Sequence, residues 1–271
     1  MNTNMKYTLI TGGSRGIGYG LARECAGRGM NLLLVARQQD TLEEVVSEIS
    51  KEFPVKVHGL AVDLRDSDGP LRVWEWCRKE SYRVDILINN AGVAGSTPFE
   101  SSDPAYSDDR ILVNIRALVL LTRYFLTELK THPQSHILNM GSLSAYYPIA
   151  YKSVYSASKA FVHYFSRALR QELKGSNINI TVIHPNGVRT NEGTFKRIDS
   201  HSGITKKLFV LELDEISRIA VNGMLKHKSI VVPGVANRML IIITRLLPAA
   251  FRERRLANMF RKELGEIIPR E

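Results

Sequence analysis

Residues 7–18 read YTLITGGSRGIG, a short apolar run that leads directly into a turn containing four glycines. The apolar run predicts a buried strand, and Ile17, Leu21 and Cys25 then share one stripe of a predicted helix. In an open α/β sheet, such a turn lies at the carboxyl end of a strand, where backbone N–H groups at a helix N-terminus hold a phosphate. Glycine is needed because the backbone must turn sharply and approach the ligand without a Cβ in the way.

Strand-like and helical patterns alternate through most of the chain. Further apolar runs occupy 31–36, 55–62, 85–89, 136–140, 179–184 and 229–232, and most are apolar throughout, as strands covered on both faces are. Helical patterns follow Asp40, which we expect to cap its helix, and longer ones follow Pro104 and Ser153. This order predicts a single doubly wound, Rossmann-type α/β domain with a mostly parallel seven-stranded sheet and helices on both faces.

The 271 residues fit one large α/β domain with an extension. We expect residues 1–234 to form a dinucleotide-binding catalytic domain. Within it, the segment 191–213 has weak periodicity and mixed polarity, which predicts an irregular insertion over the substrate side. Residues 235–271 form a basic, amphipathic helical extension of the same domain.

Composition narrows the class of protein. Apolar residues make up 44% and charged residues 24%, the balance of a soluble protein with a full core. Cys25 and Cys77 form no metal-ligand spacing, so no metal site is predicted, and reduced cysteines without a leader segment predict a cytoplasmic protein. The net charge of +10 favours anionic partners without choosing among them.

Some polar residues receive no functional interpretation at this level. The histidines are scattered, and the acidic residues after position 102 are expected in a solvated polar loop. These residues are His132, His136, His163, His184, Asp103, Asp108 and Asp109.

The glycine spacing TGxxxGxG resembles that of the NADP-type short-chain dehydrogenase/reductase family, and the match continues from about residue 5 to residue 234. Asp63-Leu64 is similar to the family's adenine-side pair, and residues 89–92 reproduce its NNAG motif. Asn114 lies where the family has its helix asparagine. Ser142, Tyr155 and Lys159 stand in the family's order, with the Tyr-x-x-x-Lys spacing intact.

The chemistry of these residues fits carbonyl reduction. Tyr155 and Lys159 are four positions apart in a predicted helix, so they share one face. A tyrosine hydroxyl serves as general acid or base if its pKa falls from about 10 to near 7, which requires roughly 4 kcal/mol from nearby positive charge. The resemblance implies that Lys159 also binds the nicotinamide ribose, that Ser142 orients the substrate oxygen and that Asn114 holds a water in a proton relay.

The second strand indicates which nicotinamide cofactor is used. An NAD-selective site usually has an acidic residue about 20 positions after the glycines. Here Ala36 is followed by Arg37, and Arg15 lies within the turn, so two arginines are available for a 2′-phosphate. NADP(H) is therefore the predicted cofactor. The full predicted cofactor-binding set is Gly12, Ser14, Arg15, Gly16, Ile17, Gly18, Arg37, Asp63, Leu64, Asn90, Ala91, Gly92, Tyr155, Lys159, Pro185, Val188 and Thr190.

One position departs from the family. After the sixth strand the family has Pro-Gly and then a threonine near the nicotinamide, whereas this chain has Pro185-Asn186 and reaches Thr190. Asparagine tolerates positive φ better than other non-glycine residues, so we expect Asn186 to preserve the backbone turn.

The predicted function is the NADP(H)-dependent interconversion of a secondary alcohol and a ketone. The substrate is expected to be a small molecule, with a ketone of hydrophobic or 3-oxoacyl type. The protein is expected to form a homo-oligomer, either a dimer or a tetramer. Two alternatives stay open: an NADP(H)-binding regulatory or redox-sensing protein with little turnover, and a basic peripheral membrane-binding module. No motif supports nucleic-acid binding.

The segment 235–271 carries eight Lys/Arg against four Asp/Glu and has the pattern of two amphipathic helices hinged at Pro248. Two interpretations of its apolar stripe remain at this level. The stripe packs on the domain or on a second subunit, or it lies on an anionic bilayer.

Overall fold

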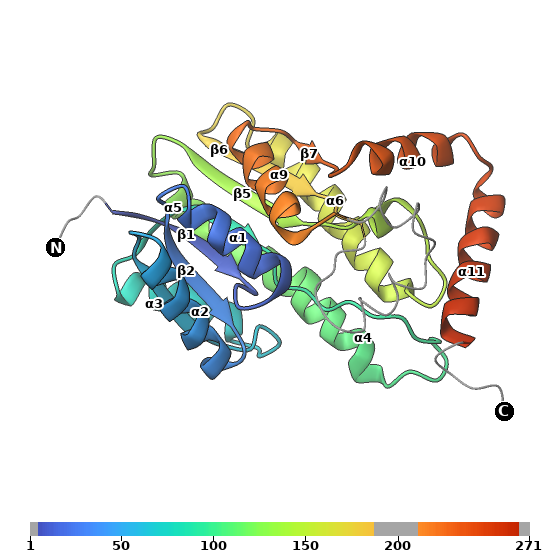
Figure 1. The fold of residues 1–271 in the computed structure, drawn as a ribbon, viewed down its shortest axis with the longest axis horizontal. Helices are drawn as coiled ribbons and strands as arrows, with labels where there is room; N and C mark the ends of the chain where they lie inside the picture. The colour runs from blue at the N-terminus through green and yellow to red at the C-terminus, as the bar shows by residue number, and fades with distance from the viewer. Residues whose placement is uncertain (1–4, 187–210, 266–271) are drawn as a thin grey trace.

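Seven strands form one parallel sheet in the computed structural model, which describes residues 5–186 and 211–265 (Figure 1). The strands are β1 (Lys6–Thr11), β2 (Asn31–Ala36), β3 (Val57–Ala61), β4 (Arg83–Asn89), β5 (Ser135–Met140), β6 (Ile178–Ile183) and β7 (Ile230–Val231). Their order across the sheet is β3-β2-β1-β4-β5-β6-β7, and each neighbouring pair is parallel. The predicted fold class is confirmed, although the last strand is shorter than the predicted run.

The strand order reverses at the centre of the sheet. There β1 pairs with both β2 and β4, with Ile10 opposite Leu34 on one side and opposite Ile88 on the other. Successive connections lead outward in opposite directions from this point. In open α/β sheets, ligands bind outside the carboxyl ends of the strands at such a switch point. The sequence places the glycine turn there, at the end of β1.

Helices cover both faces of the sheet. One face packs against α1 (Gly16–Ala26), α2 (Gln39–Glu52) and α9 (Leu213–Leu225), and the other against α3 (Gly69–Lys79), α5 (Leu118–Leu129) and α6 (Ser153–Glu172). The short helix α4 (Pro104–Ile111) and the π-helical turn η1 (Leu112–Ala117) continue directly into α5. The 3-10 turn η2 (Leu143–Tyr146) follows β5.

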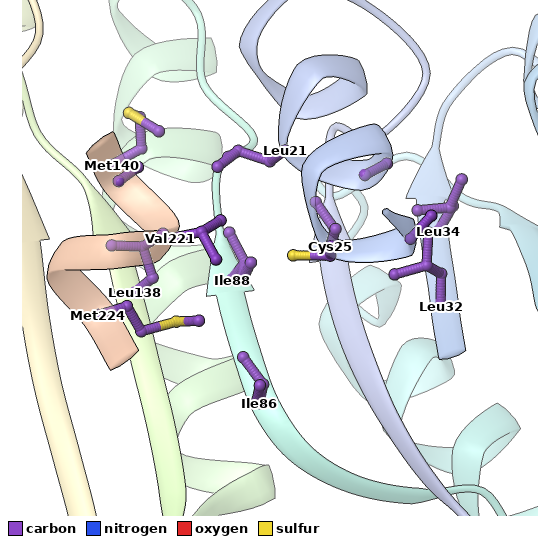
Figure 2. Packing of buried hydrophobic residues seen from close by; sticks show 14 of the residues in the cluster. Leu21, Cys25, Leu32, Leu34, Ile86, Ile88, Leu138, Met140, Val221 and Met224 are labelled. Carbon is purple, nitrogen blue, oxygen red and sulfur yellow. The ribbon is translucent and has the colours of Figure 1, made fainter. Parts of the chain in front are cut away.

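The core consists of two layers, one on each face of the sheet. Successive residues of a strand point to opposite faces, so Ile86 and Ile88 belong to one layer and Leu87 to the other. Figure 2 shows Leu21 of α1 and Val221 of α9 on the side of β4 that carries Ile88, with Ile86 farther along the strand in the same layer. Each fully buried aliphatic side chain contributes about 1.5–3 kcal/mol. β4 is therefore packed between helices on both sides.

The start of α2 differs from the prediction. The helix begins at Gln39 with Gln38 at the N-cap, which makes no side-chain capping bond. Asp40 therefore lies inside the first turn rather than at the cap. Its negative charge still interacts favourably with the positive end of the helix dipole.

The acidic residues after position 102 do not form the predicted solvated loop. Pro104 opens α4, and Asp103 caps it by accepting a hydrogen bond from the Ala105 N–H at 2.8 Å. Asp109 lies within α4 and forms an ion pair with Arg65 at 3.2 Å. The loop interpretation was wrong because proline is favourable at the first position of a helix.

The predicted insertion at 191–213 lies outside the described residues from 191 to 210. At its end the structure differs from the prediction. Leu213 begins α9, and Leu211 packs, partly buried, against the core layer beneath α1.

Two helices follow the last strand, α10 (Val235–Arg245) and α11 (Ala249–Gly265), on either side of Pro248. In Figure 1, α10 extends beyond the end of β7, and α11 turns away from its direction. Near its end, α11 approaches the loop before α6, where Arg261 Nε donates to the Tyr151 hydroxyl at 3.2 Å. No helix within 5–186 and 211–265 is long and apolar enough to cross a membrane.

Asn186 connects the end of β6 to α10. Its amide nitrogen donates to Asn237 Oδ1 at 2.8 Å, and Asn237 Nδ2 donates to the Pro233 carbonyl at 2.9 Å. Among the described residues, positive φ at non-glycine positions is confined to Ser81, Tyr151 and His227. The expected positive φ at Asn186 is therefore wrong. The side chain, rather than the backbone, explains asparagine here.

We predict that Asn186→Ala and Asn237→Ala are coupled in stability. Each removes one partner of the same amide pair, so urea unfolding of both single variants and the double variant should give a coupling energy of about 0.5–1.5 kcal/mol. Asn186→Gly restores the family's residue but loses the same bond, so it should be no more stable than Asn186→Ala. Additive effects of the two alanine variants would contradict this link.

Candidate functional site

The glycine turn after β1 is tightly closed. Gly12 and Gly16 have φ of 66° and 52°, in the left-handed region that favours glycine. A methyl group built on Gly18 would lie 1.9 Å from the Gly12 carbonyl oxygen, so no side chain fits there. The first-turn N–H groups of α1 have no partners within the helix, and no side chain caps it at Arg15. This backbone cradle fits a phosphate group.

The NNAG segment fastens the glycine turn to β4. Asn90 Nδ2 donates to the carbonyls of Thr11 at 2.9 Å and Gly12 at 3.1 Å. The Thr11 hydroxyl accepts from the N–H groups of Asn90 and Ala91. Asn90 therefore shapes the turn through bonds within the protein.

The predicted 2′-phosphate partners lie near the open ends of β1 and β2. Arg15 and Arg37 are both exposed, and Arg15 Nη2 donates to the Thr41 hydroxyl at 3.2 Å. Arg37 directly follows Ala36, the last residue of β2. Two exposed guanidinium groups at this edge fit a phosphate dianion.

The adenine-side pair after β3 has a partner that sequence reasoning missed. Arg65 bonds the Asp63 carboxylate at 2.6 Å and reaches Asp109 of α4 at 3.2 Å. Its hydrogen bonds hold the pKa of Asp63 below its usual value. Leu64 beside it is buried. The ionised Asp63 is thus fixed in orientation, and the only sequence signal was the short spacing to an arginine.

Lys159 is a buried cation at the carboxyl end of the sheet. Its Nζ donates to the Met140 carbonyl at 2.8 Å, and a methyl group built on Gly92 would lie 3.4 Å from it. Burial lowers the pKa of Lys159 to about 8. The same nitrogen lies 5.9 Å from the centre of the Tyr155 ring, as expected for residues one helical turn apart. The structure therefore brings the end of β5, the NNAG segment and the tyrosine of α6 together around one ammonium group.

Ser142 lies at the end of β5, on the element that packs against the start of α6. It caps η2 by accepting a hydrogen bond from the Ser144 N–H at 3.2 Å. Tyr155 lies in the first turn of α6 and is half-buried. Both hydroxyls are thus carried at the carboxyl edge of the sheet, Ser142 at the start of the short turn η2 and Tyr155 in the first turn of α6.

A shallow hollow opens beside Tyr155. Its lining residues are Thr97, Phe99, Ser102, Tyr106, Ser107, Tyr151, Lys152, Ser153, Val154 and Tyr155. The end of α11 lies near this hollow, because the Lys152 ammonium is 5.0 Å from the centre of the Phe260 ring. Sequence reasoning did not identify this contribution, since Phe260 is more than 100 residues from Lys152 in the chain.

Asn114 is held inside the protein by its side chain. It lies in η1, and such π-turns are frequent at functional sites. Its Oδ1 accepts from the Val93 N–H at 2.7 Å, and its Nδ2 donates to the Val93 carbonyl at 3.1 Å and to Ser158 Oγ at 3.0 Å. This anchors the segment after the NNAG motif to the long helix.

Of the three residues predicted after β6, the structure describes Pro185. It is buried, and its carbonyl accepts from the Leu143 N–H at 3.0 Å, next to Ser142. Val188 and Thr190 lie outside the described residues.

Two histidines that the sequence left scattered are in contact beside Ser142. His163 Nδ1 and His184 Nε2 are 2.9 Å apart, and His184 Nδ1 is 2.9 Å from the Ser142 carbonyl oxygen. At the level of the sequence, these two histidines have no functional interpretation. Their separation of 21 positions gave no signal, because only the packing of α6 on β6 brings them together.

Comparison with known proteins agrees with this arrangement. The family model for the short chain dehydrogenases matches residues 6–200. The chain is 33% identical to the very-long-chain 3-oxoacyl-CoA reductase of Bos taurus over 71% of its own length and 62% of the relative's. It is 34% identical to sulfoacetaldehyde reductase 2 of Chromohalobacter salexigens, over 74% of this chain and 79% of the relative.

A solved short-chain dehydrogenase from Sphingobium yanoikuyae, in complex with NADPH, has the same architecture. It superposes with a TM-score of 0.74 at 30% identity, covering 98% of this chain and 97% of the other. The glycine turn, the buried lysine and the family match over most of the chain lead to one conclusion: this chain belongs to the short-chain dehydrogenase/reductase family.

Proposed function

We propose that the protein reduces a ketone, or oxidises the matching alcohol, with NADP(H) as cofactor and Tyr155 as general acid and base. The observation that carries this proposal is the buried Lys159 ammonium, 5.9 Å from the centre of the Tyr155 ring. A cation in this position stabilises the phenolate form of a tyrosine relative to the phenol. The solved relative with NADPH supports the choice of cofactor, as do Arg15 and Arg37.

Each residue of the site has a separate role in the proposed reaction. The Ser142 hydroxyl orients the carbonyl oxygen, and Tyr155 gives that oxygen its proton as the C–O double bond is reduced. When bound, NADPH supplies the hydride that adds to the carbonyl carbon. Lys159 holds positive charge beside the phenolate that forms and binds the nicotinamide ribose. In the reverse direction, Tyr155 takes the proton from the alcohol.

The proposed substrate is a hydrophobic or 3-oxoacyl ketone. Support comes from the aromatic side chains that line the hollow and from the name of the bovine relative. A panel assay tests this at the nicotinamide absorbance, with 3-oxoacyl-CoA esters of increasing length, aryl ketones and sulfoacetaldehyde. Faster NADPH oxidation with longer acyl chains would support the proposal, whereas turnover of sulfoacetaldehyde alone would overturn it. Tight NADPH binding without turnover of any substrate would favour the regulatory alternative.

We also propose that α10 lies on an anionic bilayer. The helix buries Asn237 and Ile241 but exposes an apolar stripe on the opposite side. The stripe consists of Val235, Met239, Ile242, Ile243 and Leu246. Its spacing of three and four residues is that of one continuous helix face. A helix normally turns its apolar face inward, so this face requires a partner.

Charge favours lipid over a second copy as the occupant of this α10 stripe. Residues 235–271 carry eight Lys/Arg against four Asp/Glu, so two copies joined through the stripe would bring like charges together. Basic residues that flank an apolar helix face favour an anionic interface. The homo-oligomer that we expect could form through another surface, because Phe161 and Tyr164 of α6 are exposed. Self-association through α6 would leave the α10 stripe free to contact lipid.

The expected cytoplasmic location stays a prediction, supported by the two buried free cysteines.

Tyr155→Phe is expected to reduce kcat by about 10²- to 10⁴-fold, because it removes the transferable proton. NADPH affinity, measured by fluorescence titration, should stay close to wild type, since the ring is retained. The matched control is Tyr164→Phe, which removes an exposed hydroxyl from the same helix. A Tyr155→Phe variant with half the wild-type rate would refute the proposed role of the tyrosine.

Lys159→Met should lose activity and gain stability near neutral pH. The pKa of Lys159 falls from 10.5 to about 8 on folding, so the unfolded chain binds its proton more tightly. Burying this charge therefore costs stability below pH 8, and the cost disappears as pH rises from 8 toward 10.5. Chemical unfolding should show Lys159→Met more stable than wild type at pH 7 by about 1–3 kcal/mol, with the gain shrinking by pH 10. An equal gain at both pH values would mean that folding does not shift the pKa of Lys159.

Arg37→Asp should weaken NADPH relative to NADH by about 10- to 100-fold in kcat/KM, since it removes a charge-assisted contact worth about 1.5–3 kcal/mol. Lys79→Asp makes the same change of charge at the far end of α3 and serves as the control. Wild-type protein that prefers NADH would contradict the cofactor proposal at the outset.

The bilayer proposal predicts co-sedimentation of the full-length protein with phosphatidylcholine vesicles only when phosphatidylserine is included. Ile242→Ser with Ile243→Ser should abolish this binding, because both side chains are more than half exposed and their loss removes apolar contact with lipid. Phe99→Ser, at an exposed site outside the stripe, is the control. Wild-type protein that stays in the supernatant with both vesicle types would exclude the bilayer, and a change of oligomeric state in the double variant would assign the stripe to a second copy.

A further inference from the structure

A chain of polar groups extends from the surface of α6 to the backbone of Ser142. Arg167 Nη1 is 3.4 Å from His163 Nε2, His163 Nδ1 is 2.9 Å from His184 Nε2, and His184 Nδ1 is 2.9 Å from the Ser142 carbonyl oxygen. His163 lies one turn after Lys159 on α6, and His184 directly follows β6. Both imidazoles are buried, and the Tyr146 ring packs edge-on against each.

The hydrogen-bonding chemistry of these groups allows donation in only one direction along the series, from Arg167 toward Ser142. A guanidinium only donates hydrogen bonds, so His163 Nε2 must accept from Arg167 and the His163 proton must be on Nδ1. That proton is then donated to His184 Nε2, which leaves the His184 proton on Nδ1, facing the Ser142 carbonyl. The opposite direction would place an imidazole N–H against the guanidinium. Burial lowers the pKa of His184 to about 3, so the ring is neutral as this arrangement requires.

The backbone around Ser142 is shaped to receive His184. A methyl group built on Gly141 would lie 2.5 Å from His184 Nδ1, so the residue before the serine has no side chain that could block the ring. The N–H groups of Gly141 and Leu143 donate to the carbonyls of Ile183 and Pro185. Ser142 is thus fastened to the extension of β6 on both sides, and the imidazole satisfies its carbonyl in between.

We infer that His184 and His163 are positioning residues, which fix the backbone of Ser142 so that its hydroxyl orients the substrate carbonyl. The inference rests on the proposed role of Ser142. His184 makes the contact, and His163, held by Arg167, selects the tautomer of His184. In the other tautomer, His184 Nδ1 would accept from the Ser142 N–H, which lies at 3.3 Å, and would leave the carbonyl without this donor.

The first test is spectroscopic and requires no turnover. Long-range ¹H–¹⁵N correlation spectra of histidine-labelled protein distinguish the two imidazole tautomers, and the spectrum of His184→Asn assigns the His184 signals. We expect the Nδ1–H tautomer for His184 in wild type and a shift toward Nε2–H in His163→Leu. An Nε2–H tautomer in the wild-type protein overturns the inference, even if the proposed function is correct.

The second test separates positioning from general stability. His184→Leu should lower kcat/KM for the ketone by about 10- to 100-fold, the size of effect that a misplacement near 1 Å produces. NADPH affinity should be unchanged, because the glycine turn and Lys159 are untouched. His163→Asn retains a donor at the Nδ1 position and should stay within about threefold of wild type, whereas His163→Leu should not.

His136→Asn is the matched control, since His136 is also buried but lies near the amino end of β5, against His227. Wild-type activity in His184→Leu would overturn the inference, as would an equal loss of NADPH affinity and kcat/KM. Absence of turnover in the wild-type protein would instead refute the proposed function, and the tautomer of His184 would still be measurable.

Discussion

The arrangement of the site depends on one constraint, a lysine ammonium enclosed at the carboxyl edge of a parallel sheet. Burial of an ion is unfavourable unless fixed dipoles replace its water, and the Met140 carbonyl does so at 2.8 Å. That carbonyl is available because β5 ends there, and Gly92 leaves the space because it has no side chain. The positions of Tyr155 and of the NNAG segment follow from where this charge is accommodated.

Much of this architecture could be predicted from the sequence, because strands that are buried on both faces appear in the sequence as continuous runs of apolar residues. The run at 31–36 matches β2 residue for residue, and Pro104 and Ser153 mark the starts of α4 and α6. The relative placement of Tyr155 and Lys159, the proposed catalytic pair, could be predicted as well, because they lie one helical turn apart, where spacing in the chain determines spacing in the fold.

Interactions between distant segments could not be predicted in this way. Arg65 and Asp109 are 44 positions apart, and His163 meets His184 only because α6 packs beside β6. Asn186 was assigned a backbone role because its partner, Asn237, belongs to a helix 51 positions later. In each case only the tertiary structure brings the two partners together.

The π-helical turn η1 sets the phase of the long helix that starts at Pro104 and ends at Leu129. Successive residues of an α-helix are rotated by about 100° about the helix axis. A π-helical turn contains one residue more than an α-helical turn, so the side chains after it are rotated by about 100° relative to an uninterrupted α-helix. The face that α5 presents to β4 is therefore out of step with the face that α4 presents to Arg65. Removing a single residue between Leu112 and Ala117 would bring the two halves back into phase, but it would turn either Phe125 out of the core or Asn114 away from Val93. The extra residue is what allows one helix to place Phe125 in a hydrophobic layer and Asn114 against the segment after the NNAG motif at the same time.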